Sequence, residues 1–393
     1  VGIKNTTIRK PDTISEAELL TVEKYNILNS LKTEYAYIDD GSFFDRNLNL
    51  YGHIIIVLGV FISLYVALKL VRPDLSNEIS SLNMILVMML LMIMIVKKSK
   101  LSKDIILSKI HVLAMLLVTF FDTRVAIYVQ TLTLIIISMA VPNSFRFFVI
   151  QFFVSLVSIF VLGRNTSRSR YFVTYASVFV SYIFLMLGVA LVFDGGLDNF
   201  GWNDVGIIAM NTLFSMLTLP LSYLFERVFG FVTDLTLLEL SNTNTPLLRK
   251  LASEAPGTFQ HVMQAADLCE EALFAIGGNM LLARTGAMYH DVGKIKNPLF
   301  FTENQSGKYN LHNEMSYYES SQIIINHVLD GIEICRKYHV PEQIIDFVRT
   351  HPGTRRTEYF YQMELRENPD GDVNEADFRY HGPIPFSKET AVL

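Results

Sequence analysis

The run at residues 52–71, GHIIIVLGVFISLYVALKLV, is the first of seven apolar stretches that decide the fold. Lys69 is its only charged residue apart from His53. Its length matches the roughly 20 residues that cross a bilayer as a helix. Six more runs follow, at about 80–96, 105–121, 124–141, 146–163, 171–193 and 205–225. Seven such runs in series favour a membrane bundle over buried helices of a soluble protein.

The rest of the chain is divided by its composition. Hydrophobic residues make up 51% of the 393 residues, and they are concentrated between 51 and 230. Residues 1–50 are polar and mixed, and we expect them to be the C-terminal remnant of an extracytoplasmic domain upstream of Val1. We predict an all-α protein: a seven-helix transmembrane region at 51–230, a linker at 231–255 with short amphipathic helices, and a helical domain at 256–393.

The charge of the C-terminal part limits its partners. From residue 231 onward, 14 lysines and arginines stand against 22 aspartates and glutamates, a net charge of −8. Nucleic-acid polymers bind basic surfaces, so they are excluded as partners. A small phosphorylated ligand can still bind if metal ions supply positive charge. Cys269 and Cys335 form no metal-type pair and are expected to be small buried residues in a reducing compartment.

The sharpest chemical signal is His290-Asp291-Val292-Gly293-Lys294. A histidine beside an aspartate can place two ligands on one metal, and the second carboxylate oxygen can bridge to another. His261 lies upstream, and His327 and His351 lie downstream, on successive predicted helices. This set predicts a two-metal site, which suits attack on an anionic phosphodiester.

Lys294 and three further histidines are less specific. Lys294 follows the His-Asp pair and either adds charge to the transition state or is a solvated helix end. His312, His339 and His381 are read as ordinary core or surface residues, His312 with the most reservation.

Polar residues within the apolar runs are few: His53, Lys109, His111, Gln130, Gln151 and Asn211 among them. Most lie near the ends of the runs, where side chains that reach the interface are the simplest account. No ladder of charges follows the runs, which disfavours a transporter.

Three long segments resemble the seven-transmembrane HD-domain phosphodiesterases of the PgpH type. They are LLELSNTNTPLLRKLASEAPGTFQHV from Leu237, LLARTGAMYHDVGKIKNPLFFTENQ from Leu281 and IIINHVLDGIEICRKYHVPEQIIDFVRTH from Ile323. The resemblance implies a cytoplasmic HD domain that hydrolyses cyclic di-AMP to pApA at a centre of two iron or manganese ions. It also implies an upstream sensory domain. Its ligand positions fall on His261, His290, Asp291, His327 and His351, with Asp291 as the bridge.

Two departures from the family pattern stand out. The family usually has a second histidine after the one that matches His351, and here Pro352 takes its place. The family's last aspartate ligand lies in a helix just beyond Pro385–Thr390, and the sequence stops at Leu393. The chain as given is therefore expected to bind metal poorly and to be weakly active or inactive.

The sequence leaves alternative functions and substrates open. A non-enzymatic membrane receptor whose HD domain only binds a nucleotide is the second reading. Cyclic di-GMP is a less favoured substrate, because Gly353-Thr354-Arg355-Arg356 stands where the corresponding enzymes carry Gly-Tyr-Pro.

The orientation in the membrane is not decided by the distribution of positive charge on the loops. The expected chemistry and the free cysteines place the C-terminal domain in the cytoplasm of a bacterial inner-membrane protein. Expected partners are the bilayer, a cyclic dinucleotide, an unknown extracytoplasmic ligand and a second copy in a homodimer.

Overall fold

The computed structural model describes residues 43–98, 110–141, 143–163, 167–197, 200–305, 307, 310–369 and 373–393. Within these ranges the regular structure is helical, and the only β-type pairing is an isolated antiparallel bridge between Arg356 and Arg379. This confirms the all-α prediction. The prediction for residues 1–42 lies outside the described residues.

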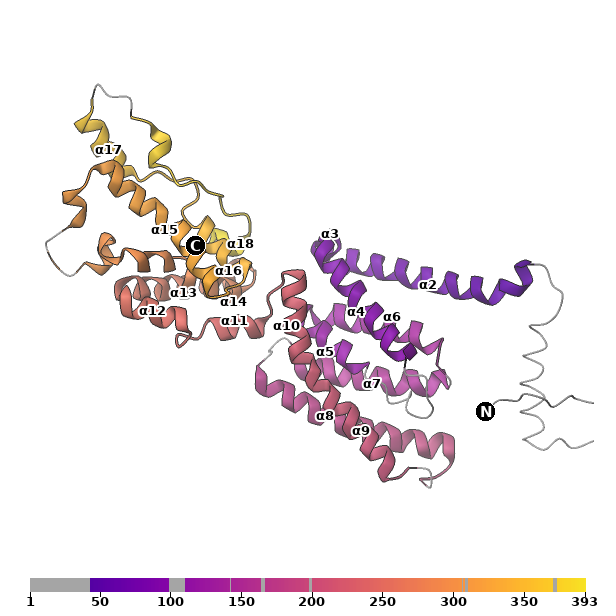
Figure 1. Ribbon diagram of the computed structural model, residues 1–393. Coiled ribbons are helices and arrows are strands. Elements are labelled where there is room, and N and C mark those ends of the chain that lie inside the picture. The colour runs from indigo at the N-terminus through magenta and orange to yellow at the C-terminus, as the bar shows by residue number, and fades with distance from the viewer. Residues whose placement is uncertain are drawn as a thin grey trace, which may run out of the picture. The chain divides into compact units, whose positions relative to one another are not determined.

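The apolar part of the chain forms a series of helices (Figure 1). Five segments are long and apolar enough to cross a membrane: Leu50–Val71, Ile79–Val96, Ser144–Leu162, Arg168–Phe193 and Trp202–Phe229. His111–Phe120 and Thr123–Ser138 are shorter apolar helices, of 10 and 16 residues. Five candidate spans are therefore established among the described residues, and the count of seven stays a prediction.

These helices have the following bounds: α2 Phe43–Val71, α3 Pro73–Asn77, α4 Ile79–Lys98, α5 His111–Phe120, α6 Thr123–Ser138, α7 Ser144–Leu162, α8 Arg168–Val189, α9 Trp202–Phe214 and α10 Thr218–Phe229. A π-helical turn, Ala190–Asp194, follows α8, and a 3₁₀ turn, Ser215–Leu217, separates α9 from α10.

The turn between α5 and α6 is short, because α5 ends at Phe120 and α6 begins at Thr123. Asp122 caps α6 by accepting a hydrogen bond from the Val125 amide at 2.9 Å. The same carboxylate pairs with the Arg72 guanidinium at 2.9 Å. An aspartate at this position satisfies one of the free amides of the first helical turn, which fixes where α6 begins.

Several polar side chains of the apolar helices are buried. The His111 ring has Nδ1 3.1 Å from the Tyr182 hydroxyl and Nε2 2.6 Å from the Ser215 hydroxyl. Tyr182 donates in turn to the Gln151 side chain at 3.0 Å. The interface is the expected place for most polar residues of the apolar runs, but His111, Gln130 and Gln151 are buried, and each has a hydrogen-bond partner within the bundle. A polar group away from water needs such partners, and neighbouring helices supply them here.

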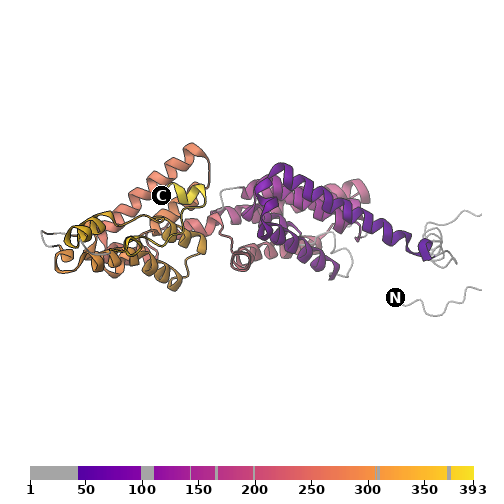
Figure 2. The same cartoon turned by 90° about the horizontal axis from the view of Figure 1, so that it is seen from above.

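The C-terminal domain is a cluster of helices that appear salmon, orange and yellow in Figures 1 and 2. Its elements are α11 Asp234–Leu240, α12 Pro246–Glu254, α13 Pro256–Ile276, α14 Met280–Tyr289, α15 Tyr317–Lys337, α16 Glu342–Thr350, α17 Glu358–Glu367 and α18 Lys388–Ala391. Short 3₁₀ turns occur at Val292–Lys296 (η4), Pro298–Phe300 (η5), Thr302–Asn304 (η6), Leu311–Glu314 (η7) and Glu375–Phe378 (η8).

The segment expected to be a linker contributes to the core of this domain. Leu237 of α11 and Leu247, Leu248 and Leu251 of α12 are buried in the same apolar cluster as residues of α13, α14 and α16. Tyr289, the last residue of α14, donates its hydroxyl to the Leu240 carbonyl at 2.9 Å. Burial of apolar side chains is the main favourable term in folding, so α11 and α12 belong energetically to the domain.

Candidate metal centre

The His-Asp pair lies where α14 ends. Asn279 caps the start of α14 by accepting from the Leu282 amide, and His290 is its C-terminal cap. His290 and Asp291 are 4% and 2% exposed. A buried carboxylate needs charged or hydrogen-bonding partners, so its surroundings define the site.

Two glycines bring α15 and its histidine against this pair. A methyl group on Gly293 would lie 1.8 Å from the His327 carbonyl oxygen and 2.6 Å from the Gly331 amide nitrogen. On Gly331 it would lie 2.8 Å from a Val348 methyl group. The glycine of the His-Asp-Val-Gly-Lys motif is therefore required for packing, because only glycine allows η4 and α15 to approach so closely.

His351 and His261 reach the pair from two other helices. His351 caps the end of α16, and α16 packs closely on α14 because Gly286 leaves room for the Phe347 ring. His261 lies on the second turn of α13. The start of that helix is held by Asn304, which accepts from the Thr258 amide at 3.0 Å.

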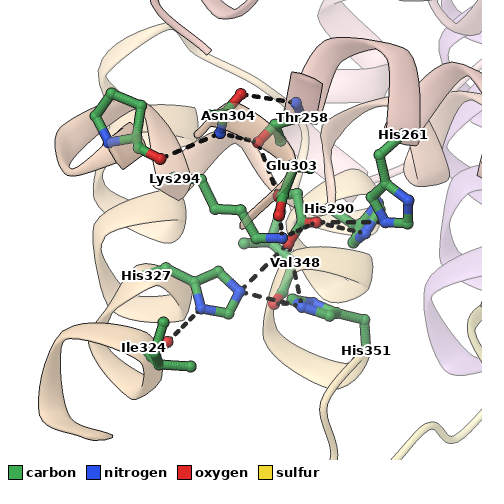
Figure 3. Close-up of polar contacts among 12 residues, drawn as sticks. Thr258, His261, His290, Lys294, Glu303, Asn304, Ile324, His327, Val348 and His351 are labelled. Carbon is green, nitrogen blue, oxygen red and sulfur yellow. Dashed lines mark hydrogen bonds and ion pairs between the residues drawn. The ribbon is translucent and has the colours of Figure 1, made fainter. Parts of the chain in front are cut away.

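Figure 3 shows His261, His290, His327 and His351 directed toward one another. The two oxygens of Asp291 face different members of this group. Oδ2 is 3.1 Å from His290 Nε2 and 3.6 Å from His261 Nε2. Oδ1 is 3.3 Å from His327 Nε2 and 3.6 Å from His351 Nε2. Two groups of potential metal ligands thus share Asp291, and each adds two histidines. A carboxylate that bridges two cations has this arrangement.

The tautomers of three histidines follow from their backbone contacts. The Nδ1 atoms of His290, His327 and His351 lie 2.7, 2.5 and 2.9 Å from the carbonyl oxygens of Ala287, Ile324 and Val348. A carbonyl only accepts, so each Nδ1 carries a proton, and each neutral ring offers the lone pair of Nε2. Such outer contacts orient imidazoles that bind metals.

One contact tests directly whether a cation fits. His327 Nε2 and His351 Nε2 are 3.2 Å apart. With both Nδ1 atoms protonated, two neutral rings would point lone pairs at each other. A cation that both nitrogens can share relieves this repulsion. Imidazole and carboxylate donors suit iron, manganese or zinc, so the residues present fit a metal centre.

The electrostatics keep the donors in their metal-binding forms. Burial lowers the pKa of His351 to about 3, so its ring is neutral at physiological pH. Burial alone would raise the pKa of Asp291, but the positive charge of the Lys294 ammonium, 2.8 Å from Oδ2, opposes this, and the pKa lies well below its usual range. Asp291 is therefore ionised.

Lys294 lies in the site and is not a solvated helix end. Its ammonium is 2.8 Å from Asp291 Oδ2 and 2.8 Å from Glu303 Oε1. Burial would lower the pKa of Lys294, yet these two carboxylates hold it above its ordinary value. Sequence reasoning missed Glu303, which also accepts from the Thr258 hydroxyl at 3.0 Å. Only its place shortly after the motif, in Phe301-Thr302-Glu303-Asn304, could have drawn attention to it.

These residues line part of an open cleft of about 870 Å³. Its other walls carry aromatic and cationic side chains, among them Phe300, His312, Arg355, Tyr359, Phe360 and Tyr380. His312, read from the sequence as an ordinary residue, packs between the Phe300 and Phe360 rings at centroid distances of 5.2 and 5.0 Å. His339 and His381 are exposed residues outside this lining. A cleft of this size, with a metal centre and aromatic walls, suits a nucleotide-sized ligand.

Comparison with known proteins agrees with this geometry. Residues 47–233 match the family described as "7TM receptor with intracellular HD hydrolase", and residues 258–378 match the HD domain. The chain belongs to the PgpH-type family of HD-domain membrane proteins. The candidate metal ligands His261, His290, Asp291, His327 and His351 all lie within the matched HD domain.

The PgpH-type relatives are substantially longer than this chain. Cyclic-di-AMP phosphodiesterase PgpH of Bacillus subtilis (strain 168) is 36% identical over 290 residues, which is 71% of this chain and 40% of the relative. The protein of the same name from Listeria monocytogenes serotype 1/2a (strain 10403S) is 45% identical over 170 residues, 43% of this chain and 23% of the relative. The crystal structure of the L. monocytogenes PgpH HD domain with cyclic-di-AMP is 45% identical, covers 38% of this chain and 70% of that one, and gives a TM-score of 0.37.

Proposed function

We propose that this chain carries the membrane anchor and the catalytic domain of a metal-dependent phosphodiesterase that hydrolyses cyclic di-AMP to pApA. The observation that carries the proposal is Asp291, whose two oxygens each face a pair of histidine Nε2 atoms. The substrate is supported by the PgpH relatives, both named for cyclic di-AMP hydrolysis. The acidic character of the domain further favours a small ligand over a nucleic-acid polymer.

The candidate ligands divide into two sets. His261, His290 and Asp291 would hold one divalent cation, and Asp291, His327 and His351 the other. Iron or manganese in these positions would supply positive charge at the phosphate and acidify a water molecule. The Nδ1 contacts of His290, His327 and His351 with main-chain carbonyls keep their Nε2 atoms directed at the phosphate site.

Hydrolysis requires one water molecule and one bond cleavage. The water oxygen bonds to phosphorus, the bond from phosphorus to the 3′ oxygen breaks, and that oxygen takes up a proton. Lys294 is charged and lies 2.8 Å from Asp291. We assign it the role of stabilising negative charge on the phosphate oxygens. Glu303 holds the Lys294 ammonium from the other side, at 2.8 Å.

We further infer that the catalytic domain faces the cytoplasm of a bacterial cell whose inner membrane holds the apolar helices, and that an extracytoplasmic sensory domain regulates it. The buried free thiols of Cys269 and Cys335 support a reducing compartment. A green fluorescent protein fused after Leu393 should fluoresce, and alkaline phosphatase at the same site should be inactive. The reverse pattern would reject this orientation.

The activity test uses the protein expressed from its complete gene and purified in detergent with Mn²⁺. Cyclic di-AMP is followed by chromatography for the wild type, for Asp291→Ala, and for His339→Ala as an exposed-histidine control. We expect pApA from the wild type and the control only. Binding of cyclic di-AMP without turnover, in protein that retains metal, would refute the enzyme and support the receptor reading. Turnover by Asp291→Ala would refute the assigned site.

A further inference from the structure

A segment near the C-terminus is paired with the chain that follows His351. The Thr357 amide donates to the Phe378 carbonyl at 2.8 Å, and the Tyr380 amide donates to the Arg355 carbonyl at 2.9 Å. These bonds flank the antiparallel bridge between Arg356 and Arg379. The backbone at 378–380 is therefore fixed by its pairing with residues 355–357.

This pairing directs Tyr380 into the metal centre. Phe378, the last residue of η8, is 2% exposed and anchors the segment by packing on the rings of Tyr318 and Tyr361. The Tyr380 ring meets His327 nearly at right angles, with centroids 6.1 Å apart, and lines the same cleft as the candidate ligands.

The hydroxyl of Tyr380 is available for a ligand. Among the described residues this hydroxyl has no hydrogen-bond partner. Its oxygen is not among the fully buried polar atoms that lack a partner, so it is accessible from the cleft. The Tyr289 hydroxyl, in contrast, is bonded to the Leu240 carbonyl. A phenol that is protonated at neutral pH and opens into a cleft is a hydrogen-bond donor for an anion.

Tyr380 and Lys294 lie on different sides of Asp291. Lys294 contacts Oδ2, the oxygen that faces His261 and His290. Tyr380 packs on His327, which faces Oδ1. A phosphodiester has two non-bridging oxygens, and the two donors flank the place where it would lie.

We propose that Tyr380 is a catalytic residue that donates a hydrogen bond from its hydroxyl to a non-bridging oxygen of the scissile phosphodiester, on the His327 side of the site. This rests on the proposed phosphodiesterase function. The bond is charge-assisted, because the acceptor oxygen is anionic, and it strengthens as charge builds up in the transition state.

The test compares Tyr380→Phe with Tyr361→Phe, a control that removes a hydroxyl from a ring packed on Phe378 but outside the cleft lining. Because one hydrogen bond to a charged group is lost, Tyr380→Phe should lower kcat/KM about tenfold to a hundredfold with unchanged metal content and melting temperature. The control should match the wild type. Equal kcat/KM in Tyr380→Phe and wild type, or loss of metal from Tyr380→Phe, would overturn the assignment.

Two substrates separate this proposal from the proposed function. Bis(p-nitrophenyl) phosphate reports on any phosphodiester cleavage, so it reads the Tyr380 effect even if cyclic di-AMP is not the substrate. The Rp,Rp and Sp,Sp phosphorothioate analogues of cyclic di-AMP, in which sulfur replaces one non-bridging oxygen of each phosphodiester, locate the contact. Sulfur accepts hydrogen bonds poorly, so the penalty of Tyr380→Phe should shrink for one diastereomer only. An equal penalty for the oxygen diester and both diastereomers would overturn the contact with a non-bridging oxygen.

Discussion

Gly293→Ala should disable the metal centre without replacing any of the candidate ligands. The added methyl group would lie 1.8 Å from the His327 carbonyl oxygen and 2.9 Å from its carbonyl carbon. These are backbone atoms of α15, so no side-chain rotation relieves the clash. Contacts under 3.0 Å force a shift, so η4 and α15 must separate by about 1 Å, a misplacement that can cost about a hundredfold in rate. Overpacking of this kind also costs about 1–3 kcal/mol in the free energy of unfolding.

The assay measures kcat/KM, bound metal per chain and thermal unfolding of the complete protein for Gly293→Ala and for Gly307→Ala. A methyl group on Gly307 meets no atom within 4 Å, so this variant should match the wild type. Gly293→Ala should lose at least about a hundredfold in activity, because the Asp291–His327 spacing changes. Wild-type activity and metal content in folded Gly293→Ala would refute the conclusion that this close approach positions His327.

Three further outcomes are expected. Leu237→Ala should lower the free energy of unfolding of the C-terminal domain by about 2–5 kcal/mol, because Leu237 is fully buried; chemical denaturation checks this, with the 44% exposed Leu238→Ala as the neutral control. Burial raises the pKa of the Cys335 thiol to about 12 from an unfolded value near 9. The unfolded chain therefore loses this proton first as pH rises, so the thiol's contribution to the free energy of unfolding is complete below pH 9 and declines between pH 9 and 12. Because the thiol is buried in the folded protein, iodoacetamide should label Cys335 at pH 8 only in denaturant. Glu303→Gln should lower kcat about tenfold with metal retained, because Lys294 loses a charged partner that holds it in place; unchanged kcat would show that Asp291 alone positions Lys294.

Much of the site could be predicted from the sequence. His290 and Asp291 are adjacent, and the histidines on neighbouring predicted helices are of the residue type that binds metals. The structure brings His261, His327 and His351 to this pair, within 3.6 Å of an Asp291 oxygen. Glu303 and Tyr380 were missed because neither lies in a recognisable pattern. A 3₁₀ turn and a backbone bridge place them in the cleft, and both depend on contacts with distant segments.

In the membrane part, too, the sequence predicts the helices but not which side chains meet between them. Hydropathy predicts apolar helices, since the bilayer demands long unbroken runs. Hydropathy alone does not decide where His111 lies, because the environment of a polar side chain depends on which helix faces it.

The sequence by itself determined the helical class, the apolar runs and the residue types of a metal centre, because these depend on local composition and spacing. Only the tertiary structure decided that each oxygen of Asp291 faces its own pair of histidines, that α11 and α12 complete the core, and that Tyr380 opens into the cleft. These features are distances between residues far apart in the chain. Close packing at Gly293, Gly331 and Gly286 positions the histidines, apolar burial holds α11 and α12, and the backbone bridge at Arg379 positions Tyr380.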